Sequence, residues 1–418
     1  MWCLYLRILQ INYSDSKGGA ARAAMRIHEG LSRLEVESLL LVSHKTTSNS
    51  YIISPKSKTE KINYLLRSQL DQIPVNLYKN RNNLFSPSWV PFSSIINTIN
   101  NINPDLVHLH WVTGGMIRIE DLLKVNKPIV WSLHDMWAFT GGCHIDDSCG
   151  KYKQECNYCP VLGSNNKRDL SSFGFKRKQR VYEELNQFTL VGPSQWMVNS
   201  IKSSRLMSKF NTVKIPNPID LHVFKPLTQA VARSILNIDA NKRIILFGAT
   251  NATGDINKGY KELYKAIELI DQKNTELYIF GATQEKSKLN FNCPVKYLGL
   301  LHDDISLMVL YSAADVMVVP SKQETFGQTA LEAMACGTPV VAYGSTGLLD
   351  IVDHQENGYL AKPSDSNDLA NGIEWVLSNK SNKLLFERTI EKVRDCFDLR
   401  IVAQKYRDLY MDIIKKED

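Results

Sequence analysis

Residues 315–342 contain two short apolar runs joined by a helix-length segment, and this pattern restricts the fold more than any other part of the chain. Residues 315–319, Asp-Val-Met-Val-Val, are typical of a buried parallel strand. The next segment, 325–335, predicts a helix that ends at Gly337. A second apolar run, Val340–Ala342, follows at once. Such a strand–helix–strand unit predicts α/β architecture with a parallel sheet.

The same alternation continues along the chain and predicts two α/β domains. Strands are expected at 5–11, 36–42, 105–109, 128–133 and 189–191, and again at 243–247, 276–280, 295–298, 316–319 and 340–342. Two prolines within Ile215-Pro-Asn-Pro218 stiffen the backbone and place the linker there. We therefore expect domains at 1–215 and 216–396, followed by a final helical segment at 397–418. Residues 44–104 are polar and weakly periodic, and they predict a variable, partly helical region.

Two carboxylates, Glu324 and Glu332, lie on the loop and the helix that follow the strand at 316–319. Helix rise places Glu332 about 12 Å further along the axis. The helix N-terminus between them favours an anion, and each carboxylate can accept hydrogen bonds from sugar hydroxyls. The spacing suits a ligand with two sugars around an anionic centre, and a nucleotide-sugar has this layout.

The Glu324-x7-Glu332 pair, followed by Gly337-Thr-Pro-Val-Val, resembles the donor site of retaining nucleotide-sugar glycosyltransferases of family 4. The likeness continues at Val213-Lys-Ile-Pro-Asn-Pro-Ile-Asp220, at Lys258-Gly259 and at Gly18-Gly19. It implies the GT-B fold, with two Rossmann-like doubly wound parallel-sheet domains facing across a cleft. The first domain would bind the acceptor and the second the nucleotide-sugar, and the final helix would cross back to the first domain.

The resemblance also implies roles for single residues. Lys258 would neutralise the leaving diphosphate, Glu324 would bind the donor sugar and Glu332 the ribose, while His134 would face the donor sugar. Family members usually carry an arginine where this chain has Ala249-Thr250, and Lys322, Arg22 or backbone amides are the candidate substitutes. The expected donor site is completed by Gly18, Gly19, Thr325, Phe326 and Gly327.

Four of these assignments have plainer alternatives on the residues alone. Lys258 and Glu332 could be ordinary helix-surface residues, His134 a structural histidine, and Gly18-Gly19 a simple strand-to-helix turn. His110-Trp111 ends the strand at 105–109, and an aromatic ring there can stack on a sugar face, so we predict contact with the acceptor.

Four cysteines fall within seventeen residues of a predicted insert at 141–163: Cys143, Cys149, Cys156 and Cys159. A reducing compartment disfavours disulfides, which leaves a tetrahedral structural zinc site or unrelated buried thiols. A zinc ion bound by these cysteines would stiffen the rim of the cleft. Catalysis itself is expected to need no cofactor, because Lys258 and helix N-termini can hold the diphosphate.

The charge and hydropathy of the chain limit its partners. Net charge is +7, and no apolar run reaches the roughly 18 to 20 residues that a membrane span needs. The N-terminus is predicted to be a first strand and not a signal peptide, so we expect a cytoplasmic protein that contacts the inner face of the plasma membrane at most peripherally. Without a nucleic-acid motif, a basic cluster predicts either a solvated helix face or a patch for anionic lipid. Its members are Lys167, Arg168, Lys176, Arg177, Lys178 and Arg180.

We therefore predict a retaining hexosyltransferase that uses a nucleoside-diphosphate sugar and a saccharide acceptor, which is expected to be lipid-linked. The cysteine-bearing insert after His134-Asp135 resembles a branch that includes colanic-acid, O-antigen and capsule enzymes, and this implies bacterial surface polysaccharide synthesis. Two alternatives stay open: a nucleotide-sugar 2-epimerase of the same architecture, and a degenerate, non-catalytic nucleotide-sugar-binding subunit.

Overall fold

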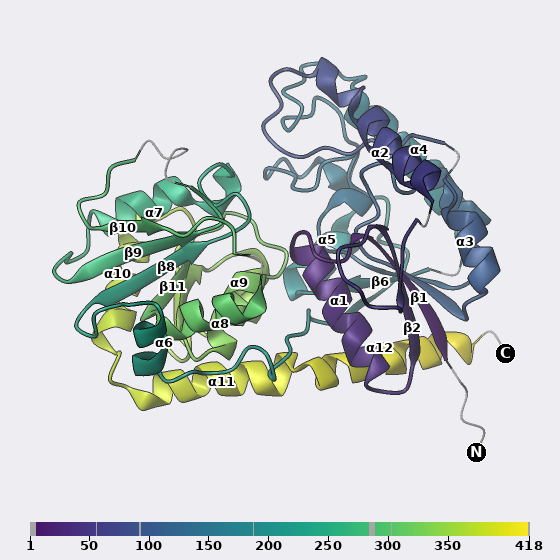
Figure 1. Cartoon of the computed structure of the whole chain (residues 1–418). Helices are drawn as coiled ribbons and strands as arrows, with labels where there is room; N and C mark the ends of the chain where they lie inside the picture. The colour runs from purple at the N-terminus through teal and green to yellow at the C-terminus, as the bar shows by residue number, and fades with distance from the viewer. Residues whose placement is uncertain are drawn as a thin grey trace. The chain divides into compact units, whose positions relative to one another are not determined.

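The computed structural model describes residues 6–55, 57–91, 93–186, 188–283, 289–301 and 303–416. The chain divides into two compact units (Figure 1). Unit 1 comprises Met1–Pro216 and Val402–Asp418, and unit 2 comprises Asn217–Ile401.

The described part of unit 1 forms a seven-stranded parallel sheet in the order β3-β2-β1-β4-β5-β6-β7. The chain builds β1, β2 and β3 outward and then returns to place β4 beside β1, so the strand order reverses between β1 and β4. The strands are β1 (Arg7–Ser14), β2 (Glu37–His44), β3 (Ile52–Ile53), β4 (Leu106–Leu109), β5 (Ile129–Ser132), β6 (Phe188–Gly192) and β7 (Asn211–Lys214). Its helices include α1 (Gly19–Ser32), α2 (Lys58–Gln72), α3 (Ile95–Ile102), α4 (Leu170–Glu184), α5 (Gln195–Ser203) and most of α12 (Leu399–Ile414).

The described part of unit 2 forms a six-stranded parallel sheet in the order β10-β9-β8-β11-β12-β13, with its reversal between β8 and β11. The strands are β8 (Arg243–Gly248), β9 (Thr275–Phe280), β10 (Val295–Tyr297), β11 (Val316–Val319), β12 (Val340–Tyr343) and β13 (Gly358–Ala361). The helices include α6 (Gln229–Ile235), α7 (Tyr260–Ile267), α8 (Asp304–Ala313), α9 (Gln328–Ala335), α10 (Ser366–Ser378) and α11 (Lys383–Phe397).

Both sheets are buried on both faces, which explains why their central strands are apolar throughout. Every residue of β4, β5, β11 and β12 is buried. Helix starts are fixed by side-chain caps, for example Asp169 before α4 and Asp303 before α8. The predicted α/β class with two doubly wound parallel sheets is therefore confirmed.

Differences from the prediction lie at the edges of elements. The helix after Glu324 begins at Gln328 and not at 325, because Gly327 takes a φ of 114° and serves as its N-cap. Strands β3, β7 and β13 were not predicted. β3 is two residues long, and β7 (Asn-Thr-Val-Lys) has no buried residue.

Helix α12 completes the core of unit 1 with two buried tyrosines. The Tyr406 hydroxyl lies 2.8 Å from Ser132 Oγ on β5, and the Tyr410 hydroxyl lies 2.7 Å from His108 Nδ1 on β4. The Tyr410 hydroxyl gives the buried His108 Nδ1 a partner, and the Tyr406 hydroxyl adds a second contact to Ser132 Oγ, which also lies 2.8 Å from His108 Nε2. Within the ranges described above, we find no helix with both the length and the apolar character of a membrane span.

Candidate functional site

Lys258 and Glu324 meet at the carboxyl ends of the strands where the order of the unit 2 sheet reverses. Lys258 ends a 3-10 turn that follows β8, and Glu324 lies on the loop that follows β11. Lys258 Nζ is 2.8 Å from Glu324 Oε2, and the two side chains are 21% and 20% exposed. Open α/β sheets bind ligands at this reversal point, so the pair marks the candidate site of unit 2.

Gly259 and Asn257 hold Lys258 in place. Gly259 has a φ of 74°, and a Cβ there would lie 1.9 Å from the carbonyl oxygen of Pro320 at the end of β11. The Asn257 side chain donates to Gln323 O at 2.7 Å and accepts from Gln323 N at 3.0 Å. These contacts fasten the turn after β8 to the loop after β11. Asn257 was not predicted as a site residue, although its position next to Lys258-Gly259 is a signal that the sequence contains.

A second loop holds the backbone of Glu324. Gly347 N donates to Glu324 O at 2.8 Å, and Glu324 N donates to Thr346 Oγ1 at 3.0 Å. A Cβ on Gly347 would lie 2.3 Å from Thr325 O, so this close approach requires glycine. The carboxylate therefore projects from a backbone that is clamped on both sides.

The Lys258 ammonium stays protonated at neutral pH. Burial disfavours the Lys258 ammonium, but the Glu324 carboxylate beside it outweighs this effect and raises the pKa of Lys258. A fixed cation and a fixed anion on one sheet edge can receive a ligand that carries both phosphates and hydroxyls.

The other predicted donor residues differ in how they can contribute. Glu332 is 2% exposed, and the Tyr311 hydroxyl donates to its Oε2 at 3.1 Å, so its burial alone no longer argues for a ligand. The Phe326 ring packs edge-on against Phe397 at 5.6 Å, which leaves its backbone as the part that can face a ligand. Lys322, a candidate for the missing arginine, lies 3.2 Å from Glu262 in an ion pair.

In unit 1 the predicted residues follow the strands around the reversal point of that sheet. Gly18-Gly19 follows β1, His110-Trp111 follows β4, and His134 follows β5. Gly18 has a φ of 88° and caps α1, and no heavy atom outside its chain neighbours lies within 4 Å of its ideal Cβ position. The backbone at Gly18 is therefore open to close approach by a ligand.

His134 ends a hydrogen-bonded chain that begins in the core of unit 1. Gln10 Nε2 donates to Ser38 Oγ, and Gln10 Oε1 lies 2.9 Å from His110 Nε2. His110 Nδ1 lies 3.0 Å from His134 Nε2. Because Gln10 Oε1 can only accept, His110 carries its proton on Nε2 and accepts at Nδ1 from His134. His134 therefore presents Nδ1 as an acceptor, and burial lowers its pKa to about 4, so it is neutral at physiological pH.

The burial of His110 gives its predicted contact with the acceptor no support, and that contact stays a prediction. Its ring is 2% exposed, and both ring nitrogens are engaged by Gln10 and His134. His110 supports His134 from within the protein. Trp111 is partly exposed, and its contact with the acceptor stays a prediction.

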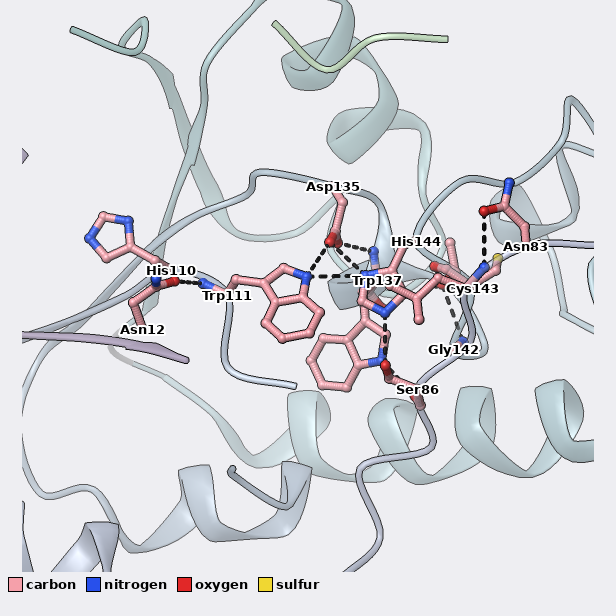
Figure 2. Close-up of polar contacts among 12 residues, drawn as sticks. Asn12, Asn83, Ser86, His110, Trp111, Asp135, Trp137, Gly142, Cys143 and His144 are labelled. Carbon is pink, nitrogen blue, oxygen red and sulfur yellow. Dashed lines mark hydrogen bonds and ion pairs between the residues drawn. The ribbon is translucent and has the colours of Figure 1, made fainter. Parts of the chain in front are cut away.

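Asp135 orients the Trp111 ring (Figure 2). Trp111 Nε1 donates to Asp135 Oδ2 at 2.8 Å, and His144 Nδ1 lies 2.6 Å from the same oxygen. Burial opposes ionisation of Asp135, but His144 and the donated hydrogen bonds lower its pKa. His144 Nε2 lies 2.8 Å from Ser86 Oγ, which completes a Ser–His–Asp sequence of contacts. Ser86 is 2% exposed, so this arrangement orients Trp111 and does not present a nucleophile.

The four cysteines of the 141–163 insert are free thiols, three of them buried. Gly141 N donates to Cys156 Sγ at 3.2 Å, and burial raises the pKa of Cys156 to about 12. In the described part of the chain, no three Cys, His, Asp or Glu side chains are placed to hold a metal ion together. The side-chain placement thus gives the zinc hypothesis no support. It stays a prediction, which metal analysis of the purified protein would test.

The prediction that the basic residues at 167–180 share one exposed surface is wrong. Arg177 makes two 2.7 Å bonds to Glu120, and Lys178 is 2% exposed. Lys178 Nζ donates to Trp137 O and Thr140 O and lies 3.7 Å from the centre of the Trp137 ring. The reason is that α4 packs this face into unit 1. The exposed members are Lys167, Arg168, Lys176 and Arg180.

Residues 229–394 match the family described as Glycosyl transferases group 1. The chain is a glycosyltransferase with a group 1 domain. The chain is 28% identical over 316 residues to an uncharacterized glycosyltransferase of Methanocaldococcus jannaschii, and the aligned segment covers 68% of this chain and 77% of that protein. The chain is also 23% identical over 367 residues to Escherichia coli WcaC, a protein named for colanic acid biosynthesis, and the aligned segment covers 83% of this chain and 85% of that protein.

The solved structure of sucrose-phosphate synthase from Thermosynechococcus elongatus superposes with a TM-score of 0.73 at 21% identity, and 98% of this chain and all of that chain are covered. This likeness shows the fold of the glycosyltransferase, which is GT-B. The predicted GT-B fold and enzyme class are confirmed, and so is the resemblance to glycosyltransferases at the level of group 1. The assignment to family 4 stays a prediction.

Proposed function

We propose that this glycosyltransferase moves a hexose-type sugar from a nucleoside-diphosphate sugar to a saccharide acceptor, with retention of anomeric configuration. Unit 2 binds the donor and unit 1 the acceptor. The observation that carries the proposal is the Lys258–Glu324 ion pair at the reversal point of the unit 2 sheet.

Each member of the pair has a separate task. The Lys258 ammonium neutralises charge that develops on the leaving diphosphate, and one such contact typically supplies about 3 kcal/mol of transition-state stabilisation. Glu324 accepts hydrogen bonds from hydroxyls of the donor sugar. The backbone amides at the start of α9, which has Gly327 as its N-cap, add hydrogen-bond donors for the phosphates.

Retention follows from attack on the same face from which the diphosphate leaves. A leaving-group oxygen takes the acceptor proton, so no side-chain nucleophile is required. The neutral His134 then accepts a hydrogen bond at Nδ1 from a sugar hydroxyl without adding charge to the site.

The relative named for colanic acid biosynthesis supports a role in bacterial surface polysaccharide synthesis. The acceptor in that setting is a saccharide carried on a lipid at the inner face of the plasma membrane.

The test starts by finding the nucleotide. Thermal unfolding with UDP, GDP, ADP and dTDP identifies the base, since a ligand at 100 times its Kd adds about 2.7 kcal/mol of stability. Sugars on that nucleotide are then assayed for transfer and slow hydrolysis with wild type, Glu324→Gln and the control Glu262→Gln. Glu262 is also 20% exposed and paired with a lysine, Lys322.

Glu324→Gln should abolish both activities and leave the fold intact, while Glu262→Gln should retain them. Wild-type turnover by Glu324→Gln would refute the assignment. Interconversion of the sugar at C2, without release of the nucleoside diphosphate, would identify a 2-epimerase instead.

A further inference from the structure

Helix α2 shows the reverse of the usual burial pattern. Its buried side chains are Arg67 and Asp71, which are charged, whereas its leucines and isoleucine face solvent. Figure 1 shows α2 at the periphery of unit 1, away from the strands of its sheet. The exposed apolar side chains are Ile62 (55%), Leu65 (54%), Leu66 (56%) and Leu70 (40%), followed by Ile73 (53%) and Leu77 (82%).

These six residues are here called the α2 stripe; four lie within α2, and Ile73 and Leu77 follow its C-terminal end. Within α2, their spacing of i, i+3, i+4 and i+8 places them on a single face. Singly exposed leucines are common, but a contiguous apolar patch of this kind marks an interaction site.

Polar contacts on the opposite side fix the helix with the stripe facing outward. Arg67 Nε donates to Gly115 O at 2.8 Å and its Nη2 to Val90 O at 2.9 Å. Trp89 N donates to Asp71 Oδ1 at 3.2 Å. The helix start is fixed by a capping box between Ser57 and Glu60. Rotating the stripe inward would break these bonds and expose the buried charges, so the outward orientation is a stable feature of unit 1.

The exposed charges around the stripe are almost all basic. Between residues 57 and 84 the exposed charged side chains are four basic ones against the single acid Glu60. The basic residues are Lys58, Lys61, Lys79 and Arg81. Exposed apolar side chains flanked in the sequence by exposed basic residues match a bilayer surface with anionic headgroups.

We propose that the α2 stripe docks this glycosyltransferase on anionic membranes. The leucines enter the boundary between headgroups and acyl chains, and the lysines and Arg81 contact lipid phosphates. This surface replaces the 167–180 cluster, which is partly internal. The proposal does not rest on the catalytic assignment, because docking requires neither donor nor transfer.

Vesicle sedimentation of the full chain tests the proposal. Vesicles of phosphatidylglycerol with phosphatidylethanolamine are compared with phosphatidylcholine vesicles, each at low and high salt. The stripe variant is Leu65→Gln, Leu66→Gln and Leu70→Gln. The matched control replaces three comparably exposed apolar residues of unit 2, Ile235→Gln (61%), Leu269→Gln (57%) and Ile305→Gln (58%).

We expect wild type and control to bind anionic vesicles, and the stripe variant to bind at least about tenfold more weakly at both salt concentrations. Replacing Lys58 and Lys61 with Gln should weaken binding chiefly at low salt. The substituted side chains are exposed, so thermal unfolding should be unchanged, and the single variant Leu66→Gln provides a milder second case.

Three outcomes would overturn the proposal. The wild-type chain does not bind anionic vesicles, or the stripe variant binds them as well as wild type does. In the third, wild type self-associates in light scattering and the stripe variant is monomeric, without a difference in vesicle binding. The stripe would then be the contact with a second copy of the chain.

Discussion

Lys258→Ala is the sharpest test of the unit 2 site, because it has two opposing effects that can be estimated separately. In the free enzyme Lys258 pairs with Glu324, and both side chains are about one-fifth exposed. Solvent screens such a pair, so its net contribution to stability is at most about 1 kcal/mol. The variant should therefore fold and unfold almost as wild type does.

In the complex the loss is larger. A cation facing the phosphates contributes about 3–4 kcal/mol to binding. Wild type loses roughly 1 kcal/mol of this when Lys258 gives up its contact with Glu324. The remaining 2–3 kcal/mol corresponds to about 30–150-fold weaker binding of the nucleoside diphosphate.

The assay compares the affinity of the diphosphate with that of the monophosphate of the same nucleoside, by thermal shift and calorimetry. Lys258→Ala should narrow the gap between the two ligands, because the lysine interacts with phosphate and not with the base. Lys258→Arg should restore part of the gap. The control is Lys392→Ala, which removes an equal charge from another ion pair of unit 2. Lys392 pairs with Asp353 at 2.9 Å and is 24% exposed. An unchanged gap in Lys258→Ala, or an equal loss in the control, would refute the reasoning.

Three further predictions concern the fold. Gly259→Ala should lower the free energy of unfolding by more than about 2 kcal/mol in denaturant unfolding, because the new Cβ would lie 1.9 Å from the carbonyl oxygen of Pro320. The control Gly344→Ala should be nearly neutral, because its Cβ would have no contact below 3.4 Å. Burial lowers the pKa of His28 to about 4, so on acidification the unfolded chain takes up a proton at a higher pH than the folded chain does. The free energy of unfolding should therefore fall by up to about 3 kcal/mol as the pH drops from 6.5 to 4, and this fall should be smaller in His28→Gln. Lys178→Glu should prevent folding by placing an anion against two carbonyls, whereas Arg180→Glu, two residues away and exposed, should leave circular dichroism and the thermal midpoint unchanged.

The apolar strands were predictable because burial on both faces demands apolar residues at every position. Val316–Val319 begins and ends where the sequence places it. Strand β7 was not, since it lies at the edge of its sheet and carries polar residues that show no periodicity. Secondary structure at an edge is decided by a neighbouring strand that the local sequence does not contain.

The candidate site was predictable as a set of residues, but not as a set of contacts. Lys258 and Glu324 were chosen separately, and their bond links positions 66 residues apart in the sequence. The same limit explains the error at Lys178 and why the sequence did not predict the burial of His110. A charged or aromatic side chain near a strand end can face either solvent or the core, and only the packing of distant elements decides which.

The helix α12 has a consequence for how the chain is made. Its residues from Val402 onward belong to unit 1, and its tyrosines supply the hydroxyls that pair with His108 and Ser132 in the unit 1 core. Unit 1 therefore cannot finish folding when its first 216 residues leave the ribosome, whereas unit 2 has its whole sequence in one continuous segment. During synthesis, the domain that begins first should be completed last, and until then its sheet carries an unfilled place for α12.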